Sequence, residues 1–301
     1  MNEKIRNKIR EILQKIEQKD VQGNSGFALN RDTISHIFET PAQNAQDIQV
    51  RLTLIDSMYS TQMNRRYYAL EELAEVLWEL NGDKPKHLEE LFEQFAQEKN
   101  ASLFDYPNSK QKIYNLWSRE YGIGKDGQSK GMAISLISKY AYFSTGYKFP
   151  IYDSIAREMI LLLCPGTHVP SKTESLKNGS GKSYGEYIIE WFLENISALC
   201  ETYDTDFDHL DRLLWFVGKI LRGNLSLVLT RQQYNNLLAL KRKGAEESKK
   251  SKKSKKSDIS EKFDITKMNI EELGLDKNDL IFDFFELAKM LADEAATQGH
   301  E

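Results

Sequence analysis

Apolar residues recur at helical spacing along almost the whole chain, and this pattern most constrains the possible folds. In the segment 64–80, for example, Leu70, Leu73 and Leu77 fall on one side of a helix. Alternating apolar and polar residues, the pattern typical of strands, are nearly absent, and the one candidate at 226–229 is too short to matter. The sequence therefore predicts an all-α protein.

Two stretches interrupt the helical pattern and are expected to be loops. One is the Gly- and Asn-rich segment after residue 19, and the other is 165–183. With 301 residues, the chain is long enough to form one large domain or two smaller ones. We expect helices at 1–19, 46–59, 64–80, 87–99, 110–121, 129–143, 154–163, 184–203, 207–221 and 230–240.

The clearest boundary is the lysine–serine run SKKSKKSKKS, Ser248–Ser257. Such a run repels itself and cannot bury apolar surface, so we expect it to be disordered. The segment 241–256 carries +7, so that the net charge of −4 leaves −11 on the rest of the chain. An acidic body with a basic segment excludes nucleic-acid binding over the whole surface, although a local DNA-binding face remains compatible with it.

These boundaries divide the chain into four expected parts, the last of which is a C-terminal tail. Residues 263–301 suggest short amphipathic helices, too short to fold alone, that would dock on the body or on a partner protein. We expect the chain to be a monomer. The expected parts are an N-terminal helix and loop at 1–45, the main helical domain at 46–240, the basic linker at 241–262 and the helical tail at 263–301.

The composition indicates in which compartment the protein is found and whether it holds disulfides or metal ions. No apolar run reaches the roughly 18 to 20 residues that span a bilayer, and the charged N-terminus does not resemble a signal peptide. Cys164 and Cys200 are too few for a disulfide framework or a thiolate zinc site, and the five histidines lack metal-ligand spacing. We therefore expect a cytoplasmic protein without membrane contact, metal or cofactor.

The segment SLISKYAYFSTGYKFPIYD, Ser135–Asp153, holds the strongest candidate site. Asp153 directly precedes the helix predicted at 154–163, where an aspartate would cap the first exposed amides. A capping carboxylate is rigidly held and stays ionised, so it could also stabilise positive charge that develops on a sugar. Asp153 could therefore cap the helix and take part in catalysis at the same time.

Lys139 stands in the middle of a helix that is apolar over much of its circumference. On a helical projection Ser135, Lys139 and Tyr142 share one side. The lysine either extends along the apolar surface to solvent or faces a pocket. In a pocket it would bind phosphate, hold the edge of a base or act as a nucleophile.

The stretch SMYSTQMNRR, Ser57–Arg66, joins two predicted helices. Small polar residues are typical of such a junction, because Ser and Thr commonly cap helices. As a DNA contact, the same junction would offer Gln62 to enter the base stack, with Arg65 and Arg66 to bind phosphates. Both interpretations remain open on these residues.

Three stretches taken together resemble the helix-hairpin-helix DNA glycosylases, which include endonuclease III and the 8-oxoguanine DNA glycosylases, in a divergent bacterial branch. Ser57–Arg66 resembles the family's early junction, whose Gln or Asn probes DNA. YGIGKDGQSKGMAISLISKYAYF, Tyr121–Phe143, resembles the Gly-rich hairpin and the helix after it. FPIYDSIAREMI, Phe149–Ile160, resembles the loop and helix that carry the essential aspartate, here Asp153. The resemblance covers 46–221.

The resemblance implies a two-lobed helical protein that binds double-stranded DNA, flips out one nucleotide and hydrolyses its base, in repair or in defence against phage. It would lie at the nucleoid if the source is bacterial. Asp153 would stabilise the sugar cation and position water, and Lys139 would line the pocket near the base; these are the implied catalytic residues. The implied DNA- and base-binding residues are Gln62, Arg65, Gly122, Gly124, Lys125, Lys130, Ser135, Tyr140 and Tyr142, with Trp117 beside the flipped base.

The chain departs from the family in two places. Gly122-Ile-Gly124 is followed by Lys-Asp-Gly-Gln-Ser where the family has a compact turn, so the hairpin is either longer or degenerate. Members that also cleave the backbone carry a lysine near the start of the next helix. Neither Lys139, 14 residues before Asp153, nor Lys130, 23 residues before it, takes that register. These differences argue against lyase activity and favour a monofunctional glycosylase.

Two other hypotheses stay open. A DNA-binding module on the same scaffold, without catalysis, is favoured by the long hairpin, the displaced lysines and the acidic body. Tight binding to DNA with no abasic product would distinguish it. A helical interaction protein without a nucleic-acid role is the second, and failure to bind DNA at low salt, where phosphate contacts are strongest, would be its mark.

Overall fold

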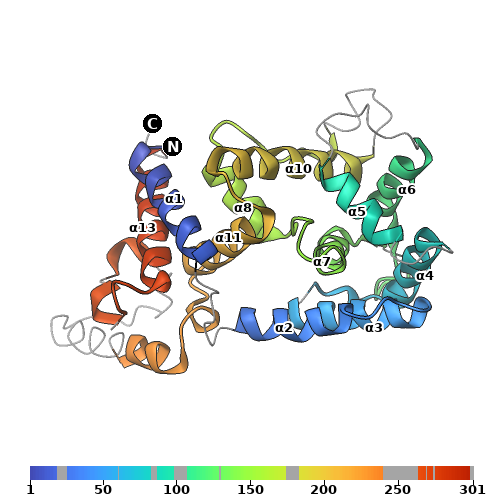
Figure 1. The fold of residues 1–301 in the computed structure, drawn as a ribbon, viewed down its shortest axis with the longest axis horizontal. Helices are drawn as coiled ribbons and strands as arrows, with labels where there is room; N and C mark the ends of the chain where they lie inside the picture. The colour runs from blue at the N-terminus through green and yellow to red at the C-terminus, as the bar shows by residue number, and fades with distance from the viewer. Residues whose placement is uncertain are drawn as a thin grey trace. The chain divides into compact units, whose positions relative to one another are not determined.

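The computed structural model confirms the all-α class (Figure 1). No described helix is both long enough and apolar enough to cross a membrane. The predicted basic linker at 241–262 lies outside the described residues. The structure describes residues 1–18, 26–59, 61–82, 87–97, 107–128, 130–173, 183–239, 264–268, 270–273 and 275–298.

The chain forms two compact units. Unit 1 contains Met1–Leu29 and Arg212–Glu301, and unit 2 contains Asn30–Asp211. These divisions differ from the expected boundaries at residues 45 and 240. They differ because the N-terminal helix packs on the C-terminal one, a pairing of distant segments that local composition does not signal.

Unit 1 is built on the contact between helices α1 (Glu3–Gln18) and α13 (Leu280–Gln298). The tail therefore docks on the chain itself. Its buried Asp283 accepts ion pairs from Lys8 and Lys15, each with a nitrogen–oxygen distance of 2.7 Å. The other elements of unit 1 are the 3₁₀ turns η2 (Leu225–Leu227), η3 (Ile265–Lys267) and η4 (Ile270–Leu273), a helix at 231–239, and most of α11 (Phe207–Leu221).

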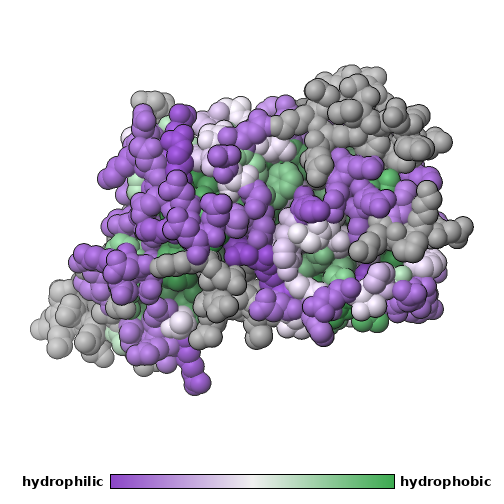
Figure 2. All heavy atoms as spheres, viewed as in Figure 1, coloured by the Kyte–Doolittle hydropathy of each residue, from purple (hydrophilic) through white to green (hydrophobic). Residues whose placement is uncertain are grey.

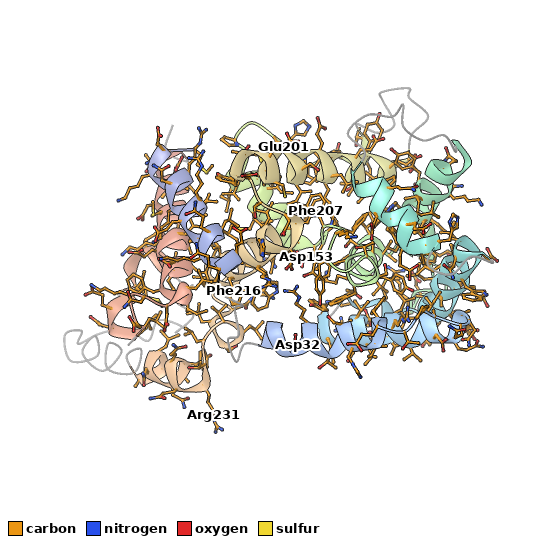
Figure 3. The ribbon with its side chains drawn as sticks, in the orientation of Figure 1. Asp32, Asp153, Glu201, Phe207, Phe216 and Arg231 are labelled. Atoms are coloured by element: carbon orange, nitrogen blue, oxygen red, sulfur yellow. The ribbon has the colours of Figure 1, made fainter. Side chains whose placement is uncertain are left out.

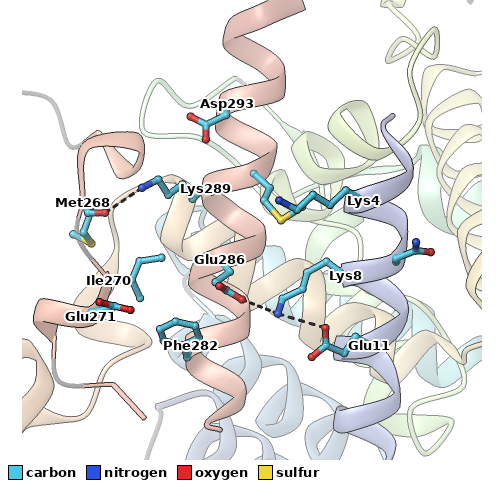
Figure 4. A pocket seen from close by; sticks show the side chains of 12 residues that line it. Lys4, Lys8, Glu11, Met268, Ile270, Glu271, Phe282, Glu286, Lys289 and Asp293 are labelled. Carbon is cyan, nitrogen blue, oxygen red and sulfur yellow. Dashed lines mark hydrogen bonds and ion pairs between the residues drawn. The ribbon is translucent and has the colours of Figure 1, made fainter. Parts of the chain in front are cut away.

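A groove of about 780 Å³ opens between α1, α13 and the two 3₁₀ turns η3 and η4 of unit 1 (Figure 4). Its walls carry charges of both signs, with Lys8 paired to Glu286 across 2.7 Å. It contains none of the candidate residues derived from the sequence. Figure 2 shows that hydrophilic residues dominate the face of the molecule seen in that view.

Unit 2 is organised around α7 (Ile134–Ser144), which is seen nearly end-on in Figure 1 and packs against α3 and α5. Nine of its residues, from Ile134 to Phe143, are buried. The remaining elements are α2 (Gly26–Phe38), α3 (Ala45–Tyr59), η1 (Met63–Arg65), α4 (Ala69–Asn81), α5 (His87–Gln97), α6 (Pro107–Ser118), β1 (Glu120–Tyr121), β2 (Gly131–Met132), α8 (Ser154–Leu163), α10 (Tyr184–Tyr203) and the start of α11.

Helix α2 corrects one sequence-based expectation, because it occupies part of the segment predicted to be a loop. The sequence there lacks a strong apolar stripe. Two buried contacts hold it instead: Ile34 is in the core, and the Arg31 guanidinium donates to Asp208 at 3.0 Å. A helix anchored by a polar contact to a distant residue leaves no periodic signal in its own sequence.

The hairpin corrects three helix boundaries. The helices predicted at 110–121 and 129–143 are shorter than expected, because the residues of β1 and β2 form strands that pair antiparallel. The helix predicted from residue 64 begins only at Ala69, because Tyr67 exchanges backbone hydrogen bonds with Ile123 at 3.0 and 2.9 Å. The hairpin joins β1 to β2. It is a short ribbon that turns through Gly122 and Gly127, which have φ of 69° and 74°.

Candidate functional site

Asp153 caps α8, as the sequence predicted. Its Oδ1 accepts hydrogen bonds from the backbone amides of Ile155 at 2.8 Å and Ala156 at 2.9 Å. Asp153 is one of the side chains labelled in Figure 3. The side chain is 25% exposed, and its second oxygen, Oδ2, is turned toward Lys139. One oxygen of the carboxylate therefore binds the backbone, and the other faces Lys139.

Lys139 points inward from α7 and does not extend to solvent, since its side chain is only 2% exposed. Its Nζ donates to the Ser135 hydroxyl at 2.8 Å and lies 3.6 Å from Oδ2 of Asp153. The same nitrogen lies 5.6 Å from the centroid of the Tyr59 ring, a cation–π arrangement. The structure thus brings Ser135, Lys139 and Asp153 together.

Contacts along the loop between α7 and α8 hold Asp153 near Lys139. Ser138 accepts from the backbone amide of Tyr152 at 3.0 Å and lies 3.2 Å from its carbonyl oxygen. Phe149 stacks on Trp117 with ring centroids 5.9 Å apart and meets Phe92 edge-on. Asp153 follows Tyr152 directly, so the hydroxyl of Ser138 ties the carboxylate to the helix that carries Lys139.

A second polar group lies at the start of α11. Asp208 accepts from the Arg31 guanidinium at 3.0 Å and from the Tyr142 hydroxyl at 2.6 Å. The guanidinium also lies 3.9 Å from the centroid of the Tyr147 ring. Burial raises the pKa of Tyr142 well above its ordinary value, and the carboxylates of Asp208 and Asp211 raise it further. Tyr142 therefore acts as a neutral hydrogen-bond donor.

Asp211 interacts electrostatically with both the Lys139–Asp153 pair and the Arg31–Asp208 pair. It is buried, with 9% of its surface exposed, and lies three residues after Asp208 on α11. Burial raises the pKa of Asp211 well above its ordinary range. Asp153 and Asp208 raise it further, whereas Lys139 and Arg31 act in the opposite direction. Burial of Asp211 therefore favours the protonated form of its carboxyl group.

Tyr59, at the end of α3, completes the arrangement. Its hydroxyl is buried and has no hydrogen-bond partner within the part of the chain that the structure describes. Burial raises its pKa, and the neighbouring Asp211 adds to the effect. We call the whole group the Lys139 cluster, defined by Arg31, Tyr59, Lys139, Tyr142, Asp153, Asp208 and Asp211.

Four members of the Lys139 cluster were missed at the sequence level: Arg31, Tyr59, Asp208 and Asp211. A signal existed for two of them, because Asp208 and Asp211 lie three residues apart at the start of a helix that is mostly apolar after residue 212. Among the described residues, no group of three or more His, Cys, Asp or Glu side chains is arranged to hold a metal ion. The chemistry available here is that of carboxyl, ammonium and hydroxyl groups.

Three aromatic residues expected near a flipped base lie in the core. Trp117, Tyr140 and Tyr142 are all fully buried. Tyr140 meets Phe38 edge-on at 5.2 Å, while Trp117 stacks on Phe149. In this conformation no base can stack on these rings. Tyr140 and Tyr142 are buried because nearly all of α7 is buried in unit 2, whereas Trp117 lies on α6 and is buried against Phe149.

The predicted junction and hairpin residues form a separate surface. Gln62 is exposed, with φ of 65°, and its side-chain oxygen accepts from Arg65 at 3.2 Å. Asp56 organises the turn from inside, accepting from the amides of Met63 at 2.8 Å and Asn64 at 3.0 Å. This role of Asp56 was not predicted from the sequence.

The hairpin docks on the same junction. The Gly122 amide donates to Glu72 at 3.0 Å, and Gly131 lies against the Arg66 guanidinium. Gly124 is buried, whereas Lys125 and Lys130 are exposed. Tyr67, whose backbone pairs with Ile123 of the hairpin, and Tyr68 have 62% and 64% of their surfaces exposed. We call this the junction–hairpin surface, comprising Gln62, Arg65, Tyr67, Tyr68, Lys125 and Lys130.

The fold and site define an all-α protein with a buried lysine–carboxyl cluster and an exposed surface of aromatic and basic residues. No family model, no curated protein and no solved structure matches this chain. Its function is therefore inferred from the chemistry of these two sites.

Proposed function

We propose that the protein is a monofunctional DNA glycosylase, which flips a damaged or modified nucleotide out of duplex DNA and hydrolyses the bond between base and sugar. The observation that carries the proposal is the placement of Asp153. Its carboxylate is fixed by two backbone amides, partly exposed, and 3.6 Å from a buried ammonium group. A preorganised carboxylate of this kind stabilises an oxocarbenium-like transition state.

The contacts of Lys139 support hydrolysis without strand cleavage. Nucleophilic attack on the sugar requires a free electron pair on the lysine nitrogen. In the ion pair with Asp153 the nitrogen is an ammonium group that also donates to Ser135. Its role in the proposed mechanism is to orient Oδ2 of Asp153 toward the sugar and the attacking water.

The junction–hairpin surface supports the DNA-binding part of the proposal. Arg65, Lys125 and Lys130 would contact phosphates, which position a protein on a duplex. Tyr67 and Tyr68 present large exposed rings, and aromatic rings stack on unpaired bases. Gln62, which was expected to fill the gap left by the flipped nucleotide, lies on the same surface.

The test is base release from duplexes that carry damaged, mismatched and phage-type modified bases, with hot alkali to cut abasic sites. We expect alkali-dependent cleavage by the wild type and a loss of at least about a hundredfold in Asp153→Asn. Asp264→Asn is the matched control, because Asp264 caps η3 through its side chain in unit 1. An Asp153→Asn variant with full activity would remove the aspartate from the mechanism.

One observation favours the second candidate, a DNA-binding module without catalysis. Trp117, Tyr140 and Tyr142 are buried, so the expected aromatic wall for a base is closed in this structure. The same experiment separates the two functions. A shift of every duplex at low salt with no abasic product would favour the binding module, and no shift at low salt would leave only a protein-interaction role.

A further inference from the structure

Ser138 on α7 holds the backbone that leads into Asp153. Its side chain is completely buried. Its Oγ accepts a hydrogen bond from the amide of Tyr152 at 3.0 Å and lies 3.2 Å from the carbonyl oxygen of the same residue. At the next position of each segment, Nζ of Lys139 lies 3.6 Å from Oδ2 of Asp153. Two successive residues of α7 therefore contact two successive residues of the loop.

The contacts of Ser138 go beyond those that the helix itself requires. A serine inside a helix usually donates to a carbonyl of its own preceding turn. Such a bond exists here, since Oγ of Ser138 lies 3.0 Å from the carbonyl oxygen of Ser135. Ser144, at the end of α7, donates in the same way to the carbonyl of Ala141 at 3.2 Å, and its hydroxyl makes no bond to the loop within the described residues. Only Ser138 adds the bonds to Tyr152.

We propose that Ser138 is a positioning residue of the proposed active site, which sets the distance between the Asp153 carboxylate and the Lys139 ammonium group. This inference rests on the proposed glycosylase function. Two amides of α8 already fix Oδ1 of Asp153, so the freedom left to the carboxylate is a shift of the loop and the start of α8 relative to α7. Ser138 removes this freedom, because its hydroxyl joins α7 to the residue directly before Asp153.

The position of Oδ2 decides how well Asp153 serves in the proposed reaction. A displacement of about 1 Å from the productive geometry lowers an enzymatic rate by up to about a hundredfold. Ser138 is buried and contacts neither the DNA nor the reacting atoms in the proposed mechanism. Its loss should therefore slow the chemical step and leave the affinity for DNA unchanged.

The first test is single-turnover base release, with protein in excess, from duplexes with uracil, hypoxanthine, 8-oxoguanine or 5-hydroxymethyluracil. Ser138→Ala should be slower by at least about tenfold, with the same dissociation constant for the duplex. Ser144→Ala is the matched control on the same helix and should keep the wild-type rate. Ser138→Cys retains most of the side-chain volume but hydrogen-bonds weakly, and it gives the same comparison if the alanine variant is unfolded.

A double variant separates positioning from a general loss of structure. In Asp153→Asn the charge to be positioned is absent, so adding Ser138→Ala should slow the residual base release by less than about twofold. A defect elsewhere in the fold would slow the wild type and Asp153→Asn by the same factor. Equal factors in the two backgrounds would overturn the inference.

Hydrogen exchange tests the contact without any substrate. The Tyr152 amide should exchange about fivefold faster in Ser138→Ala than in the wild type or in Ser144→Ala. Unchanged exchange, or a wild-type rate of base release in Ser138→Ala, would overturn the inference and leave the glycosylase function standing. A wild type that releases none of the four bases would overturn the glycosylase function, and the positioning role with it.

Discussion

Nζ of Lys139 and Oδ2 of Asp153 lie 3.6 Å apart, although the two residues belong to different helical segments and are 14 residues apart in sequence. The lysine is almost entirely buried, whereas a quarter of the aspartate side chain is exposed. Oδ1 of the same aspartate caps α8. A single carboxylate therefore links the start of one helix to the buried charge of another.

Removing the charge of Asp153 should destabilise the protein by more than the loss of a cap. Asp153→Asn retains an oxygen that can cap α8, but it leaves the buried Lys139 ammonium without its counter-charge. Breaking a buried pair in this way costs about 3 kcal/mol, and Lys139→Met in the same chain should restore much of it. Urea denaturation of the single and double variants measures this coupling. Equal effects of Asp153→Asn and of the control Asp264→Asn would contradict it.

The stability of the protein should depend on pH through Asp211. Its pKa is raised in the folded state by burial and then by Asp153 and Asp208. The stability that Asp211 contributes is fully present below the unfolded pKa of about 3.9. It is lost as pH rises from that value through the folded pKa, because over this range the unfolded state releases the proton and the folded state keeps it. Asp211→Asn should match the wild type near pH 4 and exceed its melting temperature at neutral pH. A variant equally destabilised at every pH would show that this linkage is absent.

Asp283 should hold α13 on α1. Asp283→Asn removes the charge that pairs with Lys8 and Lys15, and we expect a loss of about 2 kcal/mol in the free energy of unfolding. Glu271→Gln is the matched control, because it breaks the fully exposed pair with Lys277 and should change nothing measurable. Guanidinium denaturation compares the two. Similar effects would mean that the buried position of Asp283 contributes nothing.

Gly122 should tolerate substitution less well than Gly127. Both have positive φ, so alanine strains either position by about 1 kcal/mol. A Cβ at Gly122 would also lie 2.6 Å from the Cβ of Ala69 and 2.8 Å from the carbonyl oxygen of Tyr67, whereas nothing lies within 4 Å at Gly127. Gly122→Ala should therefore lower the melting temperature further. Equal losses would indicate that the hairpin shifts freely away from α4.

The exposed tyrosines should contribute to DNA affinity without contributing to stability. Tyr67 pairs with Ile123 only through its backbone, so Tyr67→Ala keeps the bridge. Loss of one stacking ring should weaken binding about tenfold, and Tyr68→Ala should act similarly. Fluorescence anisotropy with a labelled duplex measures this change. Val50→Ala, at an exposed residue of α3, is the control. Unchanged affinity in both tyrosine variants would exclude this surface from DNA binding.

Much of the local structure followed from the sequence. The helices predicted at 184–203 and 207–221 match α10 and α11, because their apolar residues recur with the period of the helix. The cap at Asp153 was also predictable, since an aspartate directly before an apolar helix has the amides of that helix within reach. Periodicity and capping involve residues only a few positions apart, and such relationships can be read along the chain.

The tertiary structure alone decided the site. Arg31 and Asp208, which pair at 3.0 Å, are 177 residues apart, and neither residue type indicates its partner. The sequence left open whether Lys139 reaches solvent, and the packing of α7 in the middle of unit 2 turned it toward Asp153. The same packing buried Tyr140 and Tyr142, which were expected to face a base. Helical period determines which residues share a face, but only the surrounding helices determine whether that face meets water, a charge or the core.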